Sequence, residues 1–243
     1  MKVTAIIQAR MGSTRLPGKV LKRVMDRPLL DFQLERIRMS ALLDEIIIAT
    51  TTKPEDDVLA EFAQNHSIQV YRGSEQDVLS RYFEAAQYYG ADVIVRLTSD
   101  CPIIDAAVID QVIQAFTKHK GTCKYASNTV ARTYPRGMDT EVLSMPALKR
   151  CFDEARSLSE REHVTSYIHH HPDEFSICSV RLKQDESHHR WTVDTHEDFQ
   201  LMKRMISHLY PNNPHFTFED ALEVVKQYPE WALINSHIDQ KKT

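Results

Sequence analysis

Short apolar runs alternate with amphipathic segments along the first half of this 243-residue chain. Runs such as residues 3–8 and 93–97 have the length and the β-branched composition of buried strands. Between them, apolar residues recur at helical spacing, as at Leu30, Leu34 and Ile37. Strands that alternate with helices predict an α/β domain with three layers, in which helices cover both faces of a mainly parallel sheet.

The second half of the chain is less regular. Apolar patterning there predicts strands at 124–127, 138–144 and 175–181, and helices at 146–155 and 160–169. A short strand is also expected at 191–193, before a helix with Thr195 as its N-cap. No internal repeat or linker is visible. We therefore expect one domain over residues 1–243, with an insertion at about 121–190 that faces the substrate.

Size and composition narrow the class of protein. A chain of 243 residues can form one α/β domain, and a net charge of -4 gives no support for a nucleic-acid partner. No signal peptide or membrane helix is visible, so we expect a cytoplasmic protein. The cysteines are widely spaced, form no CxxC pair and are expected to be reduced thiols: Cys101, Cys123, Cys151 and Cys178.

A basic loop follows the first predicted strand. It contains Arg10, Arg15 and Lys19, together with Gly12 and Gly18. Glycine lets a backbone turn sharply and approach a ligand closely. Arginine, lysine and loop amides are donors for anionic oxygens. The loop is therefore predicted to bind a polyphosphate; the alternative is an exposed basic loop after an edge strand.

This loop differs from the two best-known phosphate-binding motifs. Five residues separate Gly12 from Gly18, and Val20 follows Lys19 where a P-loop requires serine or threonine. The dinucleotide fingerprint G-x-G-x-x-G is absent from the chain. The sequence therefore does not support a P-loop NTPase or a Rossmann dehydrogenase.

Two aspartates are candidate metal ligands. Asp100 follows the predicted strand at 93–97, and ligands of open α/β sheets bind beyond the carboxyl ends of strands. Asp194 follows the short strand expected at 191–193. Carboxylates in these places suit Mg²⁺, which prefers oxygen ligands. The alternative is that each aspartate caps a helix, although Asp105 and Thr195 are available for that purpose.

The first loop and the two aspartates resemble the cytidylyltransferases that make CMP-activated sugar acids, within the nucleotide-diphospho-sugar transferase type of fold. The segment Ala9-Arg10-Met11-Gly12-Ser13-Thr14-Arg15-Leu16-Pro17-Gly18-Lys19 is similar to the signature loop of that family. The likeness extends over residues 1–205 and is greatest to the subgroup for spore-coat polysaccharide biosynthesis. One departure is Ser99, which precedes Asp100 where the family usually has glycine.

The resemblance implies that a sugar hydroxyl attacks the α-phosphate of CTP and releases pyrophosphate. Arg10, Lys19 and Asp100 would be catalytic, and Asp100 and Asp194 would hold Mg²⁺. The nucleotide would be bound by residues of the first loop and of a second turn: Gln8, Ala9, Arg10, Met11, Gly12, Ser13, Arg15, Lys19, Arg72 and Gly73. The choice of cytosine follows from the family likeness alone, and so does the expected homodimer.

The acceptor site is predicted from the resemblance to the family. The resemblance implies a set of sugar-binding residues: Arg136, Asp139, Glu141, Arg161 and His163. Arg136 could bind a carboxylate through two parallel hydrogen bonds, or it could be a solvated loop arginine. His163 could instead be an ordinary helix-face histidine. We interpret the histidine runs at 169–171 and 188–189 as solvated, because consecutive residues at a helix end point in different directions.

The expected function is thus Mg²⁺-dependent transfer of CMP to a sugar acid resembling a nonulosonate, for surface polysaccharide. One alternative is a pyrophosphorylase that uses another nucleoside triphosphate and a sugar phosphate. A second alternative is a non-catalytic nucleotide-binding protein. The combination of a basic loop with two aspartates argues against the second alternative, since a protein without a catalytic role would not need the complete set.

Overall fold

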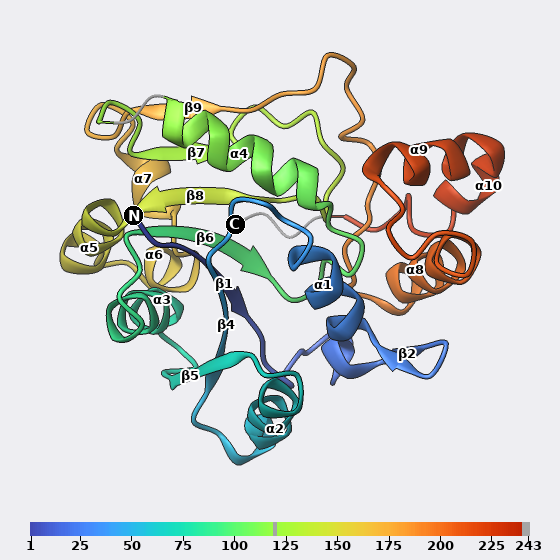
Figure 1. Cartoon of the computed structure of the whole chain (residues 1–243), viewed down its shortest axis with the longest axis horizontal. Helices are drawn as coiled ribbons and strands as arrows, with labels where there is room; N and C mark the ends of the chain where they lie inside the picture. Colours follow the sequence, from blue (N-terminus) through green and yellow to red (C-terminus); the bar gives the residue numbers. More distant parts are fainter. Residues whose placement is uncertain (119–120, 240–243) are drawn as a thin grey trace.

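A seven-stranded sheet runs through the centre of the computed structural model, which describes residues 1–118 and 121–239 (Figure 1). In spatial order the strands are β5 (Gln69–Gly73), β4 (Glu45–Thr51), β1 (Val3–Gln8), β6 (Val93–Thr98), β8 (Glu141–Ser144), β7 (Tyr125–Ser127) and β9 (Ile177–Ser179). Strand β8 runs antiparallel to its neighbours β6 and β7, and the other pairs in the sheet are parallel. The predicted mainly parallel sheet is confirmed.

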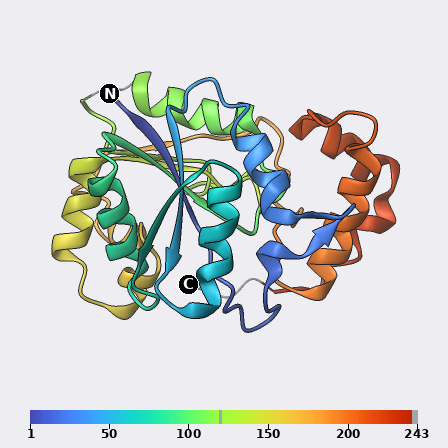
Figure 2. The ribbon, with the colours of Figure 1, turned by 60° about the horizontal axis from the view of Figure 1, so that its bottom comes forward.

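Helices cover both faces of this sheet (Figure 2). One face packs against α1 (Leu29–Ile37), α2 (Asp57–Asn65) and α4 (Ala106–Lys118). The other packs against α3 (Val78–Tyr88), α5 (Met145–Glu154) and α7 (Ser166–His170), and α6 (Leu158–Glu162) lies against α3 and α7. The predicted three-layer α/β class is therefore confirmed.

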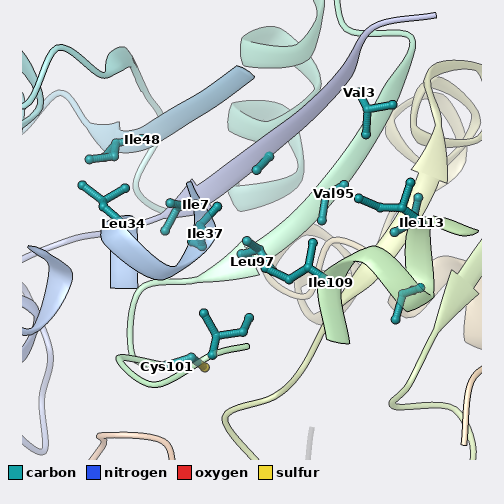
Figure 3. Packing of buried hydrophobic residues seen from close by; sticks show 14 of the residues in the cluster. Val3, Ile7, Leu34, Ile37, Ile48, Val95, Leu97, Cys101, Ile109 and Ile113 are labelled. Atoms are coloured by element: carbon teal, nitrogen blue, oxygen red, sulfur yellow. The ribbon is translucent and has the colours of Figure 1, made fainter. Parts of the chain in front are cut away.

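The strands are apolar on both sides because both sides are buried. Successive side chains of a strand point to opposite faces. Accordingly, Ile6 packs with the α3 layer, whereas Ile7 packs with Leu34 and Ile37 of α1 (Figure 3). All four side chains are fully buried. The continuous apolar run of β1 is thus explained by a central strand of a parallel sheet.

A separate group of helices lies beside the sheet, coloured orange to red in Figure 1. These are α8 (His196–Leu209), α9 (Phe218–Gln227) and α10 (Pro229–Ala232). Their core includes the buried Trp191 and is shared with the hairpin of β2 (Arg23–Val24) and β3 (Arg27–Pro28). Helix α8 begins with the expected N-cap, since Thr195 and Asp198 form a capping box.

Two local predictions are wrong. Residues 191–193 are not a strand: the Trp191 amide donates to the Arg136 carbonyl oxygen over 2.7 Å, but the bridge formed here is an isolated one between Arg136 and Arg190. The helix expected at 160–169 is divided into α6 and α7 at His163, whose backbone is not helical.

The expectation of four free thiols is also wrong. Cys123 and Cys178 form a disulfide, while Cys101 and Cys151 are free and buried. The pair is 55 residues apart in sequence, and it meets because β7 and β9 are neighbours, with Ala126 opposite Cys178. The spacing of the cysteines in the sequence does not indicate this long-range contact.

Among the residues described, no helix has the length and apolar character to cross a membrane.

Candidate active site

The first loop lies beyond the carboxyl end of β1, beside the end of β6. It returns on itself through Gly18, whose amide donates to the Met11 carbonyl oxygen over 3.0 Å. Gly18 has a φ of 64°, which favours glycine, and it begins the 3-10 helix η1 (Lys19–Leu21). The turn at Gly18 therefore directs Lys19 back toward the end of β6.

Lys19 joins the two predicted aspartates. Its Nζ atom lies 3.0 Å from Oδ2 of Asp100 and 2.6 Å from Oδ1 of Asp194. The side chains of the three residues are 14%, 21% and 15% exposed, respectively. The fold thus brings together three charged groups that the sequence analysis selected independently.

Charge balance holds these groups in their ionised forms. Burial by itself would raise the pKa of Asp100, but the Lys19 ammonium and a hydrogen bond from Thr98 outweigh it and hold the pKa at about 2. Burial would lower the pKa of Lys19, yet the charges of Asp100 and Asp194 raise it. Both carboxylate and ammonium are therefore charged at neutral pH.

The two carboxylates fit a divalent metal. They already share one cationic group, the Lys19 ammonium, and so point toward a common position. Thr98 orients Asp100 through a hydrogen bond of 2.6 Å. Arg190 lies 3.1 Å from Oδ2 of Asp194 and orients that side chain. Oxygen ligands with such supporting contacts suit a hard cation such as Mg²⁺ or Mn²⁺.

A cavity of about 770 Å³ opens over the first loop. Its wall includes Asp100, Asp194 and six residues predicted to bind nucleotide: Gln8, Ala9, Arg10, Ser13, Arg15 and Lys19. Arg15 lies 3.0 Å from Asp194, and the half-exposed Arg10 lies 3.8 Å from Glu75. Cations from one loop therefore line a space large enough for a nucleotide.

The other four predicted nucleotide contacts lie outside the wall of this cavity, within the residues that the structure describes. The Met11 amide donates to Asp56 over 2.6 Å, beside Gly12. Arg72 pairs with Asp57 at 2.7 Å and donates to two backbone carbonyl oxygens. Gly73 packs against the Arg81 side chain. Met11 and Gly12 thus belong to the first loop, and Arg72 and Gly73 to the end of β5, without lining the cavity.

A second cavity of about 780 Å³ shares a wall with the first. The shared residues are Gln8, Thr98, Asp100, His163 and Asp194. The rest of its wall includes Arg136, Asp139 and Glu141, all expected to bind the acceptor. The aspartate pair thus lies between two spaces, as a reaction between two substrates requires.

Arg136 supplies excess positive charge to the second cavity. Neighbouring Arg132 is neutralised by Asp139, with hydrogen bonds of 2.5 and 2.9 Å. Among the described residues no ion pair reaches the Arg136 side chain, which is partly exposed. Burial and the nearby charges of Arg132 and Arg190 lower the pKa of Arg136. Such a guanidinium is available to bind an anionic ligand.

Glu141 has a different environment from the one that a direct sugar contact would need. Its buried carboxylate pairs with Arg96 and accepts hydrogen bonds from Tyr125 and Thr165. Burial would raise the pKa of Glu141, but Arg96 and these hydrogen bonds lower it. In this arrangement Glu141 fixes the position of Arg96 in the cavity wall.

Arg161 also has internal partners. Its guanidinium donates to Asp77 over 2.9 Å and to the Phe152 carbonyl oxygen over 2.8 Å. It also lies over the Phe152 ring. These contacts connect α6 to the start of α3 and to α5, so the structure brings Arg161 to a helix junction, whereas it brings His163 to both cavities.

Sequence reasoning missed several residues of the site. They are Arg96, Thr98, Arg132 and Arg190. Arg96 was detectable, since it is a charged residue within the otherwise apolar run 93–97. Arg132 and Arg190 carried no such signal, because their roles depend on ion pairs formed by the tertiary structure.

Comparison with known proteins identifies the family. A model of the family described as "Cytidylyltransferase" matches residues 4–235. The chain belongs to the cytidylyltransferase family. A solved cytidylyltransferase from Leptospira borgpetersenii is 36% identical and covers 100% of both chains, with a TM-score of 0.92. The resemblance inferred from the first loop and the aspartates is confirmed, and this cytidylyltransferase is a nucleotidyltransferase.

Two curated relatives add detail to the comparison. The spore coat polysaccharide biosynthesis protein SpsF of Bacillus subtilis is 36% identical over 208 residues, which is 82% of this chain and 84% of that protein. A 3-deoxy-manno-octulosonate cytidylyltransferase of Geobacter metallireducens is 34% identical over 113 residues, 46% and 44% of the two chains. The similarity to the latter is therefore confined to about half of each protein.

Proposed function

We propose that this cytidylyltransferase transfers CMP from CTP to a hydroxyl group of a sugar acid and releases pyrophosphate. The observation that carries the proposal is the shared wall of the two cavities. Asp100 and Asp194 lie there between a basic loop and Arg136, which has no ion pair among the described residues. The similarity to a 3-deoxy-manno-octulosonate cytidylyltransferase supports a sugar-acid acceptor. The similarity to SpsF supports a role in surface polysaccharide biosynthesis.

In the proposed reaction the hydroxyl oxygen of the acceptor forms a bond to the α-phosphorus of CTP and loses its proton to water. The bond from that phosphorus to the bridging oxygen of pyrophosphate breaks. Arg10, Arg15 and Lys19 bind the β- and γ-phosphates and offset the charge of the leaving group. Their contribution is positioning and electrostatic stabilisation, which dominate in phosphoryl transfer. The acceptor hydroxyl is held in the second cavity, facing the α-phosphate.

Asp100 and Asp194 would hold the magnesium ion, whose chemistry is to neutralise phosphate charge and to orient the reacting oxygens. The Lys19 ammonium, which contacts both carboxylates in this structure, would then bind phosphate oxygens of the nucleotide. Thr98 and Arg190 keep the two carboxylates oriented throughout.

Arg136 would bind the carboxylate of the acceptor. Its position in the second cavity and the pairing of Arg132 with Asp139 support this role. His163, which borders both cavities, would contact the acceptor close to the reacting hydroxyl. Asp139 and Glu141 would act through the arginines that they hold.

The test is a matrix of pyrophosphate-release assays. CTP, UTP, GTP and dTTP are each combined with Mg²⁺ and with panels of sugar acids and sugar phosphates. We expect release with CTP and one sugar acid. Release with another triphosphate and a sugar phosphate would favour a pyrophosphorylase instead. If no combination releases pyrophosphate and CTP does not bind, the proposal is overturned.

The proposed organisation is a single domain with its substrate-facing insertion at 121–190, acting as a cytoplasmic homodimer. That segment supplies β7, β8 and β9 to the central sheet and Arg132, Arg136 and His163 to the second cavity, which supports the substrate-facing role. Light scattering on the purified chain tests the dimer. A monomer at micromolar concentration would contradict it.

A further inference from the structure

A carboxylate and two imidazoles meet on the loop before α8, outside both cavities. Residues 186–189 form a turn that is closed by a hydrogen bond of 3.1 Å from the His189 amide to the Glu186 carbonyl oxygen. The turn brings one ligand atom each of Glu186, His188 and His189 within 4.8 Å of one another. Because this is a turn and not a helix, neighbouring histidines can approach the same point.

Glu186 is the unusual member of this group. Its side chain is only 7% exposed, and its backbone is anchored by a 2.8 Å hydrogen bond from its amide to the Thr133 carbonyl oxygen. Within the described residues His189 is the only ion-pair partner of its carboxylate, with 3.6 Å between Oε2 and Nε2. That distance is too long for a hydrogen bond. A carboxylate at this depth is costly unless a cation balances it.

The imidazole of His189 faces the Glu186 carboxylate, and its side chain is only 11% exposed. A ring nitrogen of histidine binds a metal through its lone pair. The ring is held in place by stacking on buried Trp191, with 5.5 Å between centroids.

His188 completes the group from the solvent side. Its ring lies against that of His189, with 4.0 Å between centroids and a tilt of 40°. The side chain is exposed and can therefore rotate toward a ligand. The interpretation of residues 188–189 as a merely solvated pair is thus wrong for His189, which is half-buried and packed.

We propose that Glu186, His188 and His189 bind a transition-metal ion of the zinc class, separate from the magnesium at Asp100 and Asp194. Two imidazole nitrogens and one carboxylate oxygen are typical ligands of Zn²⁺, whereas Mg²⁺ prefers oxygen alone. Zinc bonds of about 2.0–2.1 Å in a tetrahedron place ligand atoms about 3.4 Å apart. The 3.6 Å between Glu186 and His189 needs only a small adjustment to reach that value.

The metal would stabilise the loop before α8, which is hydrogen-bonded to the backbone of Arg136 in the wall of the second cavity. The Arg136 amide donates to the His189 carbonyl oxygen over 3.1 Å, and the Trp191 amide donates to the Arg136 carbonyl oxygen over 2.7 Å. Residue 136 is therefore held by backbone contacts on both sides of residue 190. A metal at this turn stabilises the segment that carries Arg136, so its role is structural.

The test uses the full-length chain without a histidine tag, stripped with EDTA and kept in millimolar Mg²⁺ so that the aspartate pair is occupied. Zn²⁺ is titrated by calorimetry, and Co²⁺ by the visible absorption of four-coordinate cobalt. We expect one equivalent of each ion to bind. His188→Gln and Glu186→Gln should each weaken binding at least about 100-fold, since even loss of a supporting contact outside the ligand set costs about 10–100-fold.

Matched variants separate this site from other metal-binding groups. His170→Gln removes an exposed histidine of the other run, and Asp100→Asn alters the aspartate pair; both should keep the Co²⁺ spectrum. Zn²⁺ should also raise the thermal unfolding midpoint of the wild type and not that of His188→Gln. Because His188 is exposed, its substitution leaves the fold intact. Absence of stoichiometric binding, or binding that survives both His188→Gln and Glu186→Gln, would overturn the proposal.

Discussion

The ammonium of Lys19 lies 2.6 Å from Oδ1 of Asp194, although 175 positions separate the two residues along the chain. The same nitrogen contacts Asp100, so one side chain of the first loop joins the ends of two distant segments. Arg15 and Arg190 also contact Asp194, so both carboxylates have cationic partners within the protein. Under the proposed function, phosphate and metal would replace the contacts that Lys19 makes.

Replacing Lys19 by methionine should lower the rate of pyrophosphate release about 100- to 1,000-fold, because a buried charge that stabilises the leaving group is lost. The measurement is kcat with saturating CTP, acceptor and Mg²⁺. Lys22→Met is the matched control, since the Lys22 ammonium lies over the Phe199 ring, 5.5 Å from its centroid. Equal activity of the two variants would contradict the role of Lys19.

Asp100 should make the stability of the protein sensitive to acid. Its pKa is about 2 in the folded protein, compared with about 3.9 in an unfolded chain. A lowered carboxyl pKa stabilises the fold above the unfolded value, and this stability is lost as the pH falls toward the folded value. Urea unfolding from pH 5 to about pH 2 measures the loss.

Asp100→Asn is the comparison for this prediction. The variant lacks the titrating carboxyl, so its unfolding free energy should fall less steeply than that of the wild type between about pH 4 and pH 2. Identical slopes in the two proteins would mean that the Lys19–Asp100 pair does not perturb this pKa.

Arg136→Met should weaken use of the acceptor and leave CTP binding unchanged. Losing a charge-assisted hydrogen bond costs about 1.5–3 kcal/mol, which corresponds to a loss of about 10- to 100-fold in kcat/KM for the sugar acid. Steady-state kinetics with each substrate varied in turn separates the two effects. A change in the KM for CTP alone would assign Arg136 to the nucleotide instead.

Arg161→Met should affect stability more than catalysis. Its contacts with Asp77 and Phe152 connect three helices, and their loss should lower the free energy of unfolding by about 1–2 kcal/mol. Arg156→Met, at an exposed arginine nearby, is the control for chemical denaturation. A loss of kcat/KM for the acceptor as large as that of Arg136→Met would instead support the sugar-binding role implied by the resemblance.

Gly137→Ala should be strongly destabilising. Gly137 has a φ of 105°, and an added Cβ would lie 2.5 Å from the Trp191 carbonyl oxygen. Backbone strain and this contact together should cost at least about 2 kcal/mol. Gly90→Ala is the control: it also has a positive φ, but open space surrounds the position of the added atom. Thermal unfolding midpoints that fall equally would show that the contact with Trp191 does not matter.

Local patterns in the sequence were sufficient for the strands and for several helix ends. The apolar run at 3–8 is β1, and Thr195 is the expected N-cap of α8. Local sequence patterns did not predict features that depend on residues far away in the chain. Residues 191–193 form no strand, since the bridge next to them, between Arg136 and Arg190, is isolated. Cys123 meets Cys178 only because β7 and β9 pair.

The sequence alone determined the layered α/β class, the family and the basic loop with its two aspartates, because these depend on periodicity and on residue types at particular positions. Asp100 does follow strand β6, whereas Asp194 was selected correctly although the segment before it is not a strand. Tertiary structure decided which charges are partnered. It paired Arg161 with Asp77 and Glu141 with Arg96, and left Arg136 to face a cavity. The physical reason is that an ionic contact requires approach within a few ångströms, and this approach is set by the packing of segments far apart in the chain.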